Sequence, residues 1–216
     1  YPARQVGGDL YDFFIHENTL FFAIGDVSGK GIPASLLMAS TISLLRTLSS
    51  GSNSPSQIAY SLNNSIAERN EADMFVTFFI GMLDLRTGVM KYCNAGHTPP
   101  VLTSPDRTVA FFEMQSDLPL GILKNHDYQE YTYRFVSGSG ILLYTDGVTD
   151  AENEKNEFYT RERLLEIVTQ NQELHPREFI RSIINDIQSH IKSHELSDDL
   201  SMLTFIYGSE WNIKKS

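Results

Sequence analysis

The sequence is short of residues on which several common classes of protein depend. Its 216 residues include a single cysteine, Cys93, which excludes a disulfide within the chain and a cysteine cluster for metal binding. Lys and Arg number 17 against 27 Asp and Glu, so the formal net charge is −10. An acidic chain binds nucleic acid and anionic membranes poorly, because both carry negative charge themselves. No run of residues approaches the ~20 apolar positions that a membrane span requires.

The sequence also lacks an initiator methionine and a signal peptide, since it opens with Tyr1, Pro2 and Ala3. We therefore expect a segment of a longer protein, located in the cytoplasm unless the full-length protein is tethered to a membrane. Hydrophobic residues make up 41% and charged residues 20%, as in an ordinary globular protein. The longest polar stretch, residues 49–55, is too short for a domain linker, which predicts one domain over residues 1–216.

Apolar patterning predicts strands through most of the chain and helices in two places. Strands are expected in apolar segments at 7–14, 20–24, 75–85, 89–94, 109–112, 128–135, 141–144 and 200–207. Helices are expected where apolar residues recur at helical spacing, from 33 and from 54 onward, and over 161–170 and 176–193. Strands joined mostly by hairpins, with helix pairs early and late, indicate an α+β fold of antiparallel sheets covered by helices.

Aspartates stand at the ends of the apolar strand segments, namely Asp9, Asp26, Asp146, Asp198 and Asp199. Buried carboxylates without partners are costly, and few cations lie near these five in the sequence. If the strand ends converge, divalent cations bound through oxygen would balance the charge, and a two-metal site activates water for attack at phosphorus. Aspartate beside glycine at a strand end is also ordinary turn chemistry, and the spacing alone leaves this alternative open.

Other kinds of active site find less support in the sequence. The glycine-rich turn at 25–31 has three residues between its first glycine and the Gly-Lys pair, whereas a nucleotide-binding phosphate loop needs four. A Gly-x-Ser-x-Gly elbow, typical of many serine hydrolases, is absent. His97 is a candidate ligand or acid–base group, although a lone histidine in a turn is more often structural. Cys93 is expected to be a buried, unreactive thiol.

Six sequence blocks, taken in order, carry a resemblance to a known family. They are VGGDLYDF (6–13), FFAIGDVSGKGIPASLLMA (21–39), YCNAGHTPP (92–100), LPLGI (118–122), GILLYTDGVTDAEN (140–153) and SDDLSML (197–203). Together they resemble the SpoIIE/RsbU branch of the metal-dependent (PPM, type 2C) serine/threonine phosphatases of bacteria. The resemblance implies a four-layer α/β/β/α sandwich, in which helices flank a central antiparallel β-sandwich. It also implies a dependence on Mn²⁺ or Mg²⁺, with two bound ions, or three.

The resemblance assigns metal-binding roles to particular residues. Asp26 is similar to the aspartate that bridges both ions, and Val27 would offer its backbone carbonyl to the first ion. Asp146 and Asp198 are similar to the acids that bind the second ion. Asp199 stands where many relatives have asparagine, so its place in the ligand set ranks below that of Asp198.

The implied reaction is direct hydrolysis of phosphoserine or phosphothreonine in a protein, through attack by a hydroxide that bridges the two ions. Asp9 resembles the acid that holds a water on the first ion. Asp9, Asp26 and Asp146 are therefore the residues expected to carry catalysis.

Two positions can be compared with functional residues of the eukaryotic-type relatives. Those relatives have a histidine two residues after the bridging aspartate, which can protonate the leaving group, whereas this chain has Ser28. A metal-bound water or another group, with His97 as one candidate, would have to supply that proton. Arg4 stands five residues before Asp9, as does a phosphate-binding arginine of those relatives. The alternative for Arg4 is a flexible terminal residue without a role.

The resemblance also implies partners. The expected substrate is a phosphorylated anti-sigma-factor antagonist, and an upstream sensor or receiver domain is expected to move the helix pair at 33–69. An apolar face on that pair would be a contact for a homodimer. The alternative function is a non-catalytic regulatory module of the same fold that binds a partner. A nucleotide cyclase is disfavoured, because the sequence has no basic cluster to hold a triphosphate.

Overall fold

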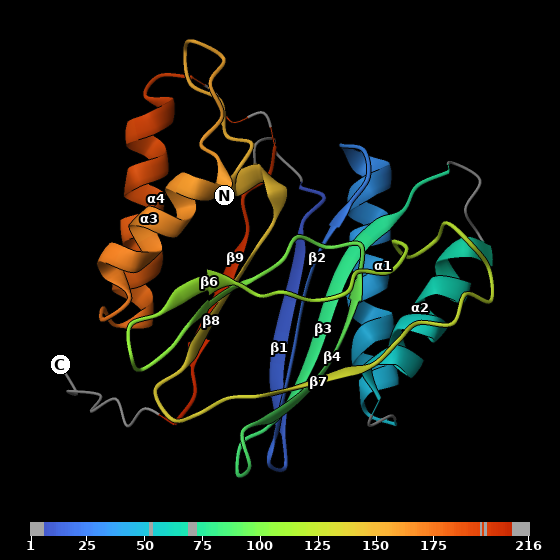
Figure 1. The fold of residues 1–216 in the computed structure, drawn as a ribbon. Helices are drawn as coiled ribbons and strands as arrows, with labels where there is room; N and C mark the ends of the chain where they lie inside the picture. The colour runs from blue at the N-terminus through green and yellow to red at the C-terminus, as the bar shows by residue number, and fades with distance from the viewer. Residues whose placement is uncertain (1–6, 52–53, 69–72, 195, 197, 209–216) are drawn as a thin grey trace, which may run out of the picture.

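The computed structural model describes residues 7–51, 54–68, 73–194, 196 and 198–208, and these form four layers. Helices α3 (Arg161–Asn171) and α4 (Pro176–Ile191) make one outer layer, and α1 (Ile32–Ser49) and α2 (Pro55–Glu68) make the other. Two antiparallel sheets lie between them (Figure 1). The α+β sandwich expected from the sequence is therefore confirmed.

The five-stranded sheet packs under α1 and α2. Its strand order is β1-β2-β3-β4-β7, with every neighbouring pair antiparallel. The strands span Leu10–His16 (β1), Thr19–Val27 (β2), Val76–Asp84 (β3), Val89–Ala95 (β4) and Tyr131–Arg134 (β7). Two of the four pairings, β1–β2 and β3–β4, are hairpins, whereas α1 and α2 lie between β2 and β3 in the chain.

The four-stranded sheet packs under α3 and α4 in the order β6-β5-β8-β9. Its strands span Val101–Thr103 (β5), Val109–Phe111 (β6), Gly140–Tyr144 (β8) and Met202–Ile206 (β9). The short strand β5 was not expected from the sequence, because three residues are too few to show a period-2 pattern. A single turn of 3-10 helix, η1 (Asp146–Val148), follows β8 directly.

Alternating side chains on the strands divide the interior into three apolar layers. On β2, Phe21 and Ala23 face the α1–α2 pair, whereas Phe22 and Ile24 face the other sheet. Such alternation is the expected geometry of a strand that is covered on both sides. The third layer lies between the four-stranded sheet and the helices, where Ile183 and Ile187 of α4 pack with their neighbours.

Pro33 lies in the first turn of helix α1. A backbone N–H in that turn has no acceptor within the helix, so proline costs no hydrogen bond there. Among the helices of the described residues, α1 alone is long and apolar enough to cross a membrane by length and composition. A helix packed on a protein core can meet the same criterion. Here α1 lies on β1 and β2, and its Ala34 and Leu45 are buried in the helix-side core.

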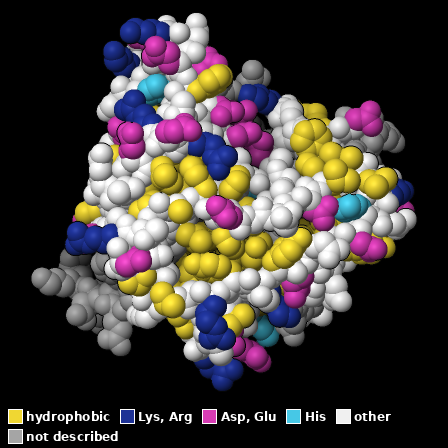
Figure 2. All heavy atoms as spheres, in the orientation of Figure 1, with side chains coloured by type: hydrophobic (Ala, Val, Ile, Leu, Met, Phe, Trp, Pro, Cys, Tyr) yellow, Lys and Arg dark blue, Asp and Glu magenta, His cyan; other side chains and the backbone are white. Residues whose placement is uncertain are grey.

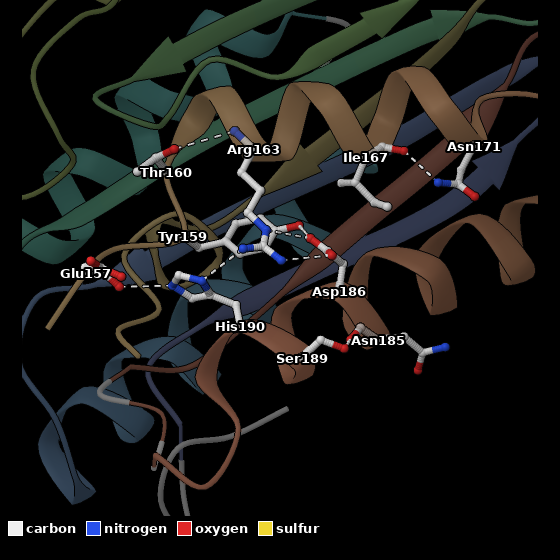
Figure 3. Close-up of polar contacts among 10 residues, drawn as sticks. All are labelled: Glu157, Tyr159, Thr160, Arg163, Ile167, Asn171, Asn185, Asp186, Ser189 and His190. Carbon is white, nitrogen blue, oxygen red and sulfur yellow. Dashed lines mark hydrogen bonds and ion pairs between the residues drawn. The ribbon is translucent and has the colours of Figure 1, made fainter. Parts of the chain in front are cut away.

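One polar cluster fixes the outer pair of helices to each other (Figure 3). Arg163 of α3 donates two hydrogen bonds to Asp186 of α4, at 2.9 Å to Oδ2 and 3.0 Å to Oδ1. The Tyr159 hydroxyl donates a third at 2.6 Å, and these donors lower the pKa of Asp186. His190 bridges Arg163 to the backbone carbonyl of Glu157. Because these polar groups satisfy one another, we assign the cluster a structural role.

Candidate metal centre

The predicted site aspartates lie at one end of the sandwich, where strands of both sheets begin or end. Leu10 of β1 pairs with Gly25 of β2. Asp9 and Asp26 are the neighbouring residues in the chain, at the same end of this strand pair. Asp146 opens the turn after β8, and Asp198 and Asp199 precede β9, which pairs antiparallel with β8. Acidic side chains gather near the top of the view in Figure 2, at this end of the molecule.

Hydrogen bonds join the two sheets at this end. The Thr145 hydroxyl donates to Asp9 Oδ2 at 2.8 Å and accepts from the Ser201 backbone nitrogen at 3.0 Å. The Gly8 backbone nitrogen donates to Asp199 Oδ2 at 2.6 Å. The segment that leads into β1 is therefore held against the segments that flank β8 and β9.

Two glycines allow the backbone to approach closely at the site. A β-carbon at Gly8 would lie 3.3 Å from the Val27 carbonyl oxygen and 3.6 Å from Asp26 Oδ1, so these two oxygens face one small region. A β-carbon at Gly147 would lie 1.9 Å from the Asp199 carbonyl oxygen, which no side chain could tolerate. Glycine at 147 is therefore a steric requirement of the fold around Asp146.

The acids raise one another's pKa values. Burial first, and then the charges of Asp9, Asp146 and Asp198, raise the pKa of Asp26 to about 8. Burial outweighs the hydrogen bonds from Thr145 and Ser201 and, together with the charge of Asp199, raises the pKa of Asp9 to about 6. The pKa of Asp146 is raised for the same two reasons, burial first and then the charges of Asp150 and Asp198. Repulsion between carboxylates at close range is the signature of a cluster that lacks sufficient positive charge.

Among the described residues, a lysine forms an ion pair with one of these acids. Lys30, in the turn after β2, forms an ion pair with Asp198 at 3.1 Å between Nζ and Oδ2. Both side chains are about two-fifths exposed, so the pair is screened by solvent and offsets little of the charge on the inner acids.

The donor chemistry of the cluster fits a hard divalent cation. It offers carboxylate oxygens from Asp9, Asp26, Asp146 and Asp198, and the Val27 carbonyl oxygen lies close to Asp26. Oxygen donors of this kind are those that Mg²⁺ and Mn²⁺ prefer. Across the described ranges, no three His, Cys, Asp or Glu side chains already meet at the spacing of a single ion site.

The structure thus brings together Asp9, Asp26, Asp146 and Asp198, and places Asp199 beside Gly8. Their metal-binding roles remain predictions. Arg4 lies outside the described residues.

Two residues that the sequence analysis did not single out also belong to the site. Thr145 orients Asp9, and Asp150 lies close enough to raise the pKa of Asp146. Asp150 follows η1 in the chain. Its spacing of four residues from Asp146 is the feature of the sequence that could have identified it as part of the site. A further acid, Asp12, points away from the cluster and forms two hydrogen bonds with Arg46 of α1, at 2.6 and 2.8 Å.

His97 and Cys93 are both buried. The Nδ1 atom of His97 lies 3.0 Å from the Thr77 hydroxyl, and Thr77 in turn approaches the Asp26 carbonyl oxygen at 3.5 Å. Burial lowers the pKa of His97 to about 4, so its ring is neutral at physiological pH. Burial raises the pKa of the Cys93 thiol to about 12, which leaves it protonated and a poor nucleophile.

The chain is similar to proteins of known family and structure. The family model "Stage II sporulation protein E (SpoIIE)" matches residues 16–206. Phosphoserine phosphatase RsbU of Bacillus subtilis is 30% identical over 203 residues, a match that covers 94% of this chain and 60% of RsbU. This chain thus spans less than two thirds of that relative.

Solved structures share the fold. The SiaA-PP2C domain of Pseudomonas aeruginosa superimposes with a TM-score of 0.84 at 17% identity, covering 95% of this chain and 83% of that domain. RsbX in complex with magnesium superimposes with a TM-score of 0.69 at 18% identity, covering 93% of this chain and 87% of RsbX. The family match extends over most of the chain and includes four of the five site aspartates. The chain belongs to the SpoIIE family.

Proposed function

We propose that the chain is a metal-dependent protein serine/threonine phosphatase, a phosphoric monoester hydrolase. The observation that carries the proposal is the convergence of Asp9, Asp26, Asp146 and Asp198 from both sheets. Burial first, and then the charges of neighbouring acids, raise the pKa values of Asp9, Asp26 and Asp146. The similarity to RsbU, named a phosphoserine phosphatase, supports the same reaction. Raised carboxylate pKa values in a cluster of this kind are typical of functional sites.

The proposed cofactors are two Mn²⁺ or Mg²⁺ ions. Asp26 would contact both, with the Val27 carbonyl oxygen and Asp9 on one side and Asp146 and Asp198 on the other. When bound, such ions lower the pKa of water and neutralise charge on a phosphoryl group. The similarity of the fold to RsbX, solved in complex with magnesium, supports a divalent cation.

Residues around the acids hold them in position. Thr145 donates to Asp9 and thereby keeps one carboxylate oxygen directed across the gap between the sheets. Lys30 holds Asp198 from the side of the β2 turn. Ser28, which stands where eukaryotic-type relatives have histidine, accepts a hydrogen bond from the Phe75 backbone nitrogen at 2.8 Å. That hydroxyl therefore ties the β2 turn to the start of β3 and does not replace the acid–base function of a histidine.

We extend the proposal to the substrate and to the full-length protein. The substrate is phosphoserine on a regulatory protein, an anti-sigma-factor antagonist, and the chain forms one phosphatase domain of a longer cytoplasmic protein with an upstream sensor or receiver domain. Helix α1 exposes Ile32 and Leu36, at 72% and 65%, which supports a contact with that domain or with a second copy.

The test is hydrolysis of p-nitrophenyl phosphate and of a phosphoserine protein, with and without Mn²⁺. Wild type is compared with Asp26→Asn, Asp146→Asn and the control Asp127→Asn, which removes a charge from an exposed position outside the cluster. We expect Mn²⁺-dependent release of phosphate by wild type and Asp127→Asn only. Failure of wild type to hydrolyse either substrate, although Mn²⁺ is bound, would contradict the proposal and favour a partner-binding module.

A further inference from the structure

Lys30 lies at the tip of the turn between β2 and α1, at the edge of the acid cluster. Ser28 fixes one side of this turn, because its backbone nitrogen donates to the Phe75 carbonyl at 2.8 Å and its hydroxyl accepts from the Phe75 nitrogen. On the other side, the Ser35 nitrogen of α1 donates to the Gly31 carbonyl at 3.1 Å. Both sides of the turn are therefore anchored, and Lys30 stands between them.

The two glycines beside Lys30 leave the tip of the turn uncrowded. Gly29 and Gly31 have φ angles of 90° and 83°, a backbone conformation that favours glycine. A β-carbon at either position would meet no atom within 4 Å beyond its chain neighbours. The Lys30 side chain is 40% exposed and carries its ammonium group on a flexible aliphatic stem. That ammonium group can therefore reach more than one acceptor at the mouth of the cluster.

Lys30 is paired with an acid for which a metal ion would compete. Its Nζ atom lies 3.1 Å from Oδ2 of Asp198, a carboxylate that the proposed centre assigns to a divalent cation. The charge of Asp198 acts on both Asp26 and Asp146, so this pair lies within the cluster. An ion pair between side chains of this exposure is weak. A divalent cation at Asp198 would therefore displace the ammonium group at little cost.

The charges at the occupied site leave a phosphoryl group without full compensation. The four acids that converge from the two sheets carry up to four negative charges, which two divalent cations balance. A phosphate monoester adds nearly two negative charges near pH 7. The ammonium group of a lysine binds phosphate as a point charge and donates charge-assisted hydrogen bonds to it. Lys30 is a described cation within reach of that added charge.

We propose that Lys30 is a ligand of the substrate phosphoryl group: it holds Asp198 in the metal-free protein, and it donates to phosphoryl oxygens once a divalent cation takes its place on Asp198. This inference rests on the proposed phosphatase function and adds a substrate contact to it. It also couples the two binding events, because the ammonium group becomes available to phosphate only after it has left Asp198.

Calorimetric titration of the metal-free proteins with Mn²⁺ tests the first of these two contacts. Wild type is compared with Lys30→Met and with the control Lys91→Met, which breaks an ion pair of similar length, 3.2 Å to Glu130, outside the cluster. We expect Lys30→Met to bind Mn²⁺ about 3- to 10-fold more tightly, because no ammonium group has to be displaced, and Lys91→Met to match wild type. Weaker binding of Mn²⁺ by Lys30→Met would overturn the proposal, since Lys30 would then be positioning Asp198 for the cation.

Calorimetric titration of the Mn²⁺-loaded proteins with inorganic phosphate tests the second contact. We expect Lys30→Met to bind phosphate at least ~10-fold more weakly than wild type, and Lys30→Arg, which keeps the charge, to bind nearly as well as wild type. The KM for p-nitrophenyl phosphate should also rise in Lys30→Met, whereas Lys91→Met should change neither quantity.

Equal phosphate affinity of wild type and Lys30→Met, or no binding of phosphate by wild type, would overturn the proposal. Binding of phosphate requires no turnover, so the role of Lys30 and the phosphatase function are tested separately. If phosphate binds through Lys30 but wild type hydrolyses no phosphate ester, the phosphatase function fails and the assignment of Lys30 as a phosphate ligand stands.

Discussion

Replacing Asp26 by asparagine is expected to stabilise the metal-free protein while removing its response to divalent cations. The Asp26 carboxyl group is buried among three other acids, and its pKa is raised from 3.8 to about 8. Near pH 8, Asp26 lowers the stability of the folded protein largely because its charged carboxylate is buried next to other negative charges. Asparagine has nearly the same shape, carries no charge and can still donate a hydrogen bond to Asp9.

The magnitude follows from the shift in pKa. A raised pKa means that the folded state binds a proton more tightly than the unfolded state between pH 4 and 8. The associated stability is fully present below pH 3.8 and is lost as the pH rises through about 8. About four pKa units at ~1.4 kcal/mol each give an upper bound of about 6 kcal/mol. Solvent reaches part of the site, and screening reduces this to roughly 2 kcal/mol, or about 4–8 °C in melting temperature.

The assay is thermal unfolding in a chelator at pH 5 and pH 8, with and without added Mn²⁺. Metal-free wild type should melt at a lower temperature at pH 8 than at pH 5, and Asp26→Asn should reduce that difference. Mn²⁺ should raise the melting temperature of wild type but not that of the variant, because a ligand stabilises only the state that binds it. Asp127→Asn, which removes an equal charge from an exposed position, should behave like wild type. Lower stability of metal-free Asp26→Asn at pH 8 would refute the electrostatic reasoning.

Three further substitutions test separate parts of the structure. Thr145→Val removes the hydroxyl shared by Asp9 and the Ser201 nitrogen, and should lower the free energy of unfolding by about 1–2 kcal/mol in urea titrations and weaken Mn²⁺ binding. Gly147→Ala forces the Asp199 carbonyl to move and should abolish Mn²⁺ binding in calorimetry; unchanged affinity would contradict the steric argument. Arg46→Met leaves the buried carboxylate of Asp12 unpaired and should cost about 1–3 kcal/mol in urea titrations, whereas a neutral result would show that solvent already satisfies that carboxylate.

Most of the fold could be predicted from the sequence because periodicity reports burial directly. The continuous apolar run before Asp26 lies in β2, covered on both faces, and the isoleucine stripe of residues 176–193 lies in α4. The strand expected at 128–135 is shorter, at Tyr131–Arg134, since Tyr128 packs in the α1–α2 core without joining the ladder. Strand β5 is too short to carry a pattern and depends on the pairing with β8.

The site was predictable only in part. Acids at strand ends are visible in the sequence, but their convergence depends on which strand ends share one end of the sandwich. Thr145 carries no signal of its own, because its role arises from a contact with Asp9 across 136 positions in the sequence. Asp12 and Asp9 lie three residues apart, yet strand alternation and Arg46 direct Asp12 to α1 and away from the cluster.

The central claim is that these acids form a metal centre, and calorimetric titration of the metal-free protein with Mn²⁺ tests it most directly. Wild type, Asp26→Asn and Asp127→Asn are compared at pH 8. We expect two ions per chain for wild type and Asp127→Asn, with release of protons from the acids whose pKa values are raised, and loss of this binding in Asp26→Asn. Equal binding by wild type and Asp26→Asn, or no binding by wild type, would contradict it.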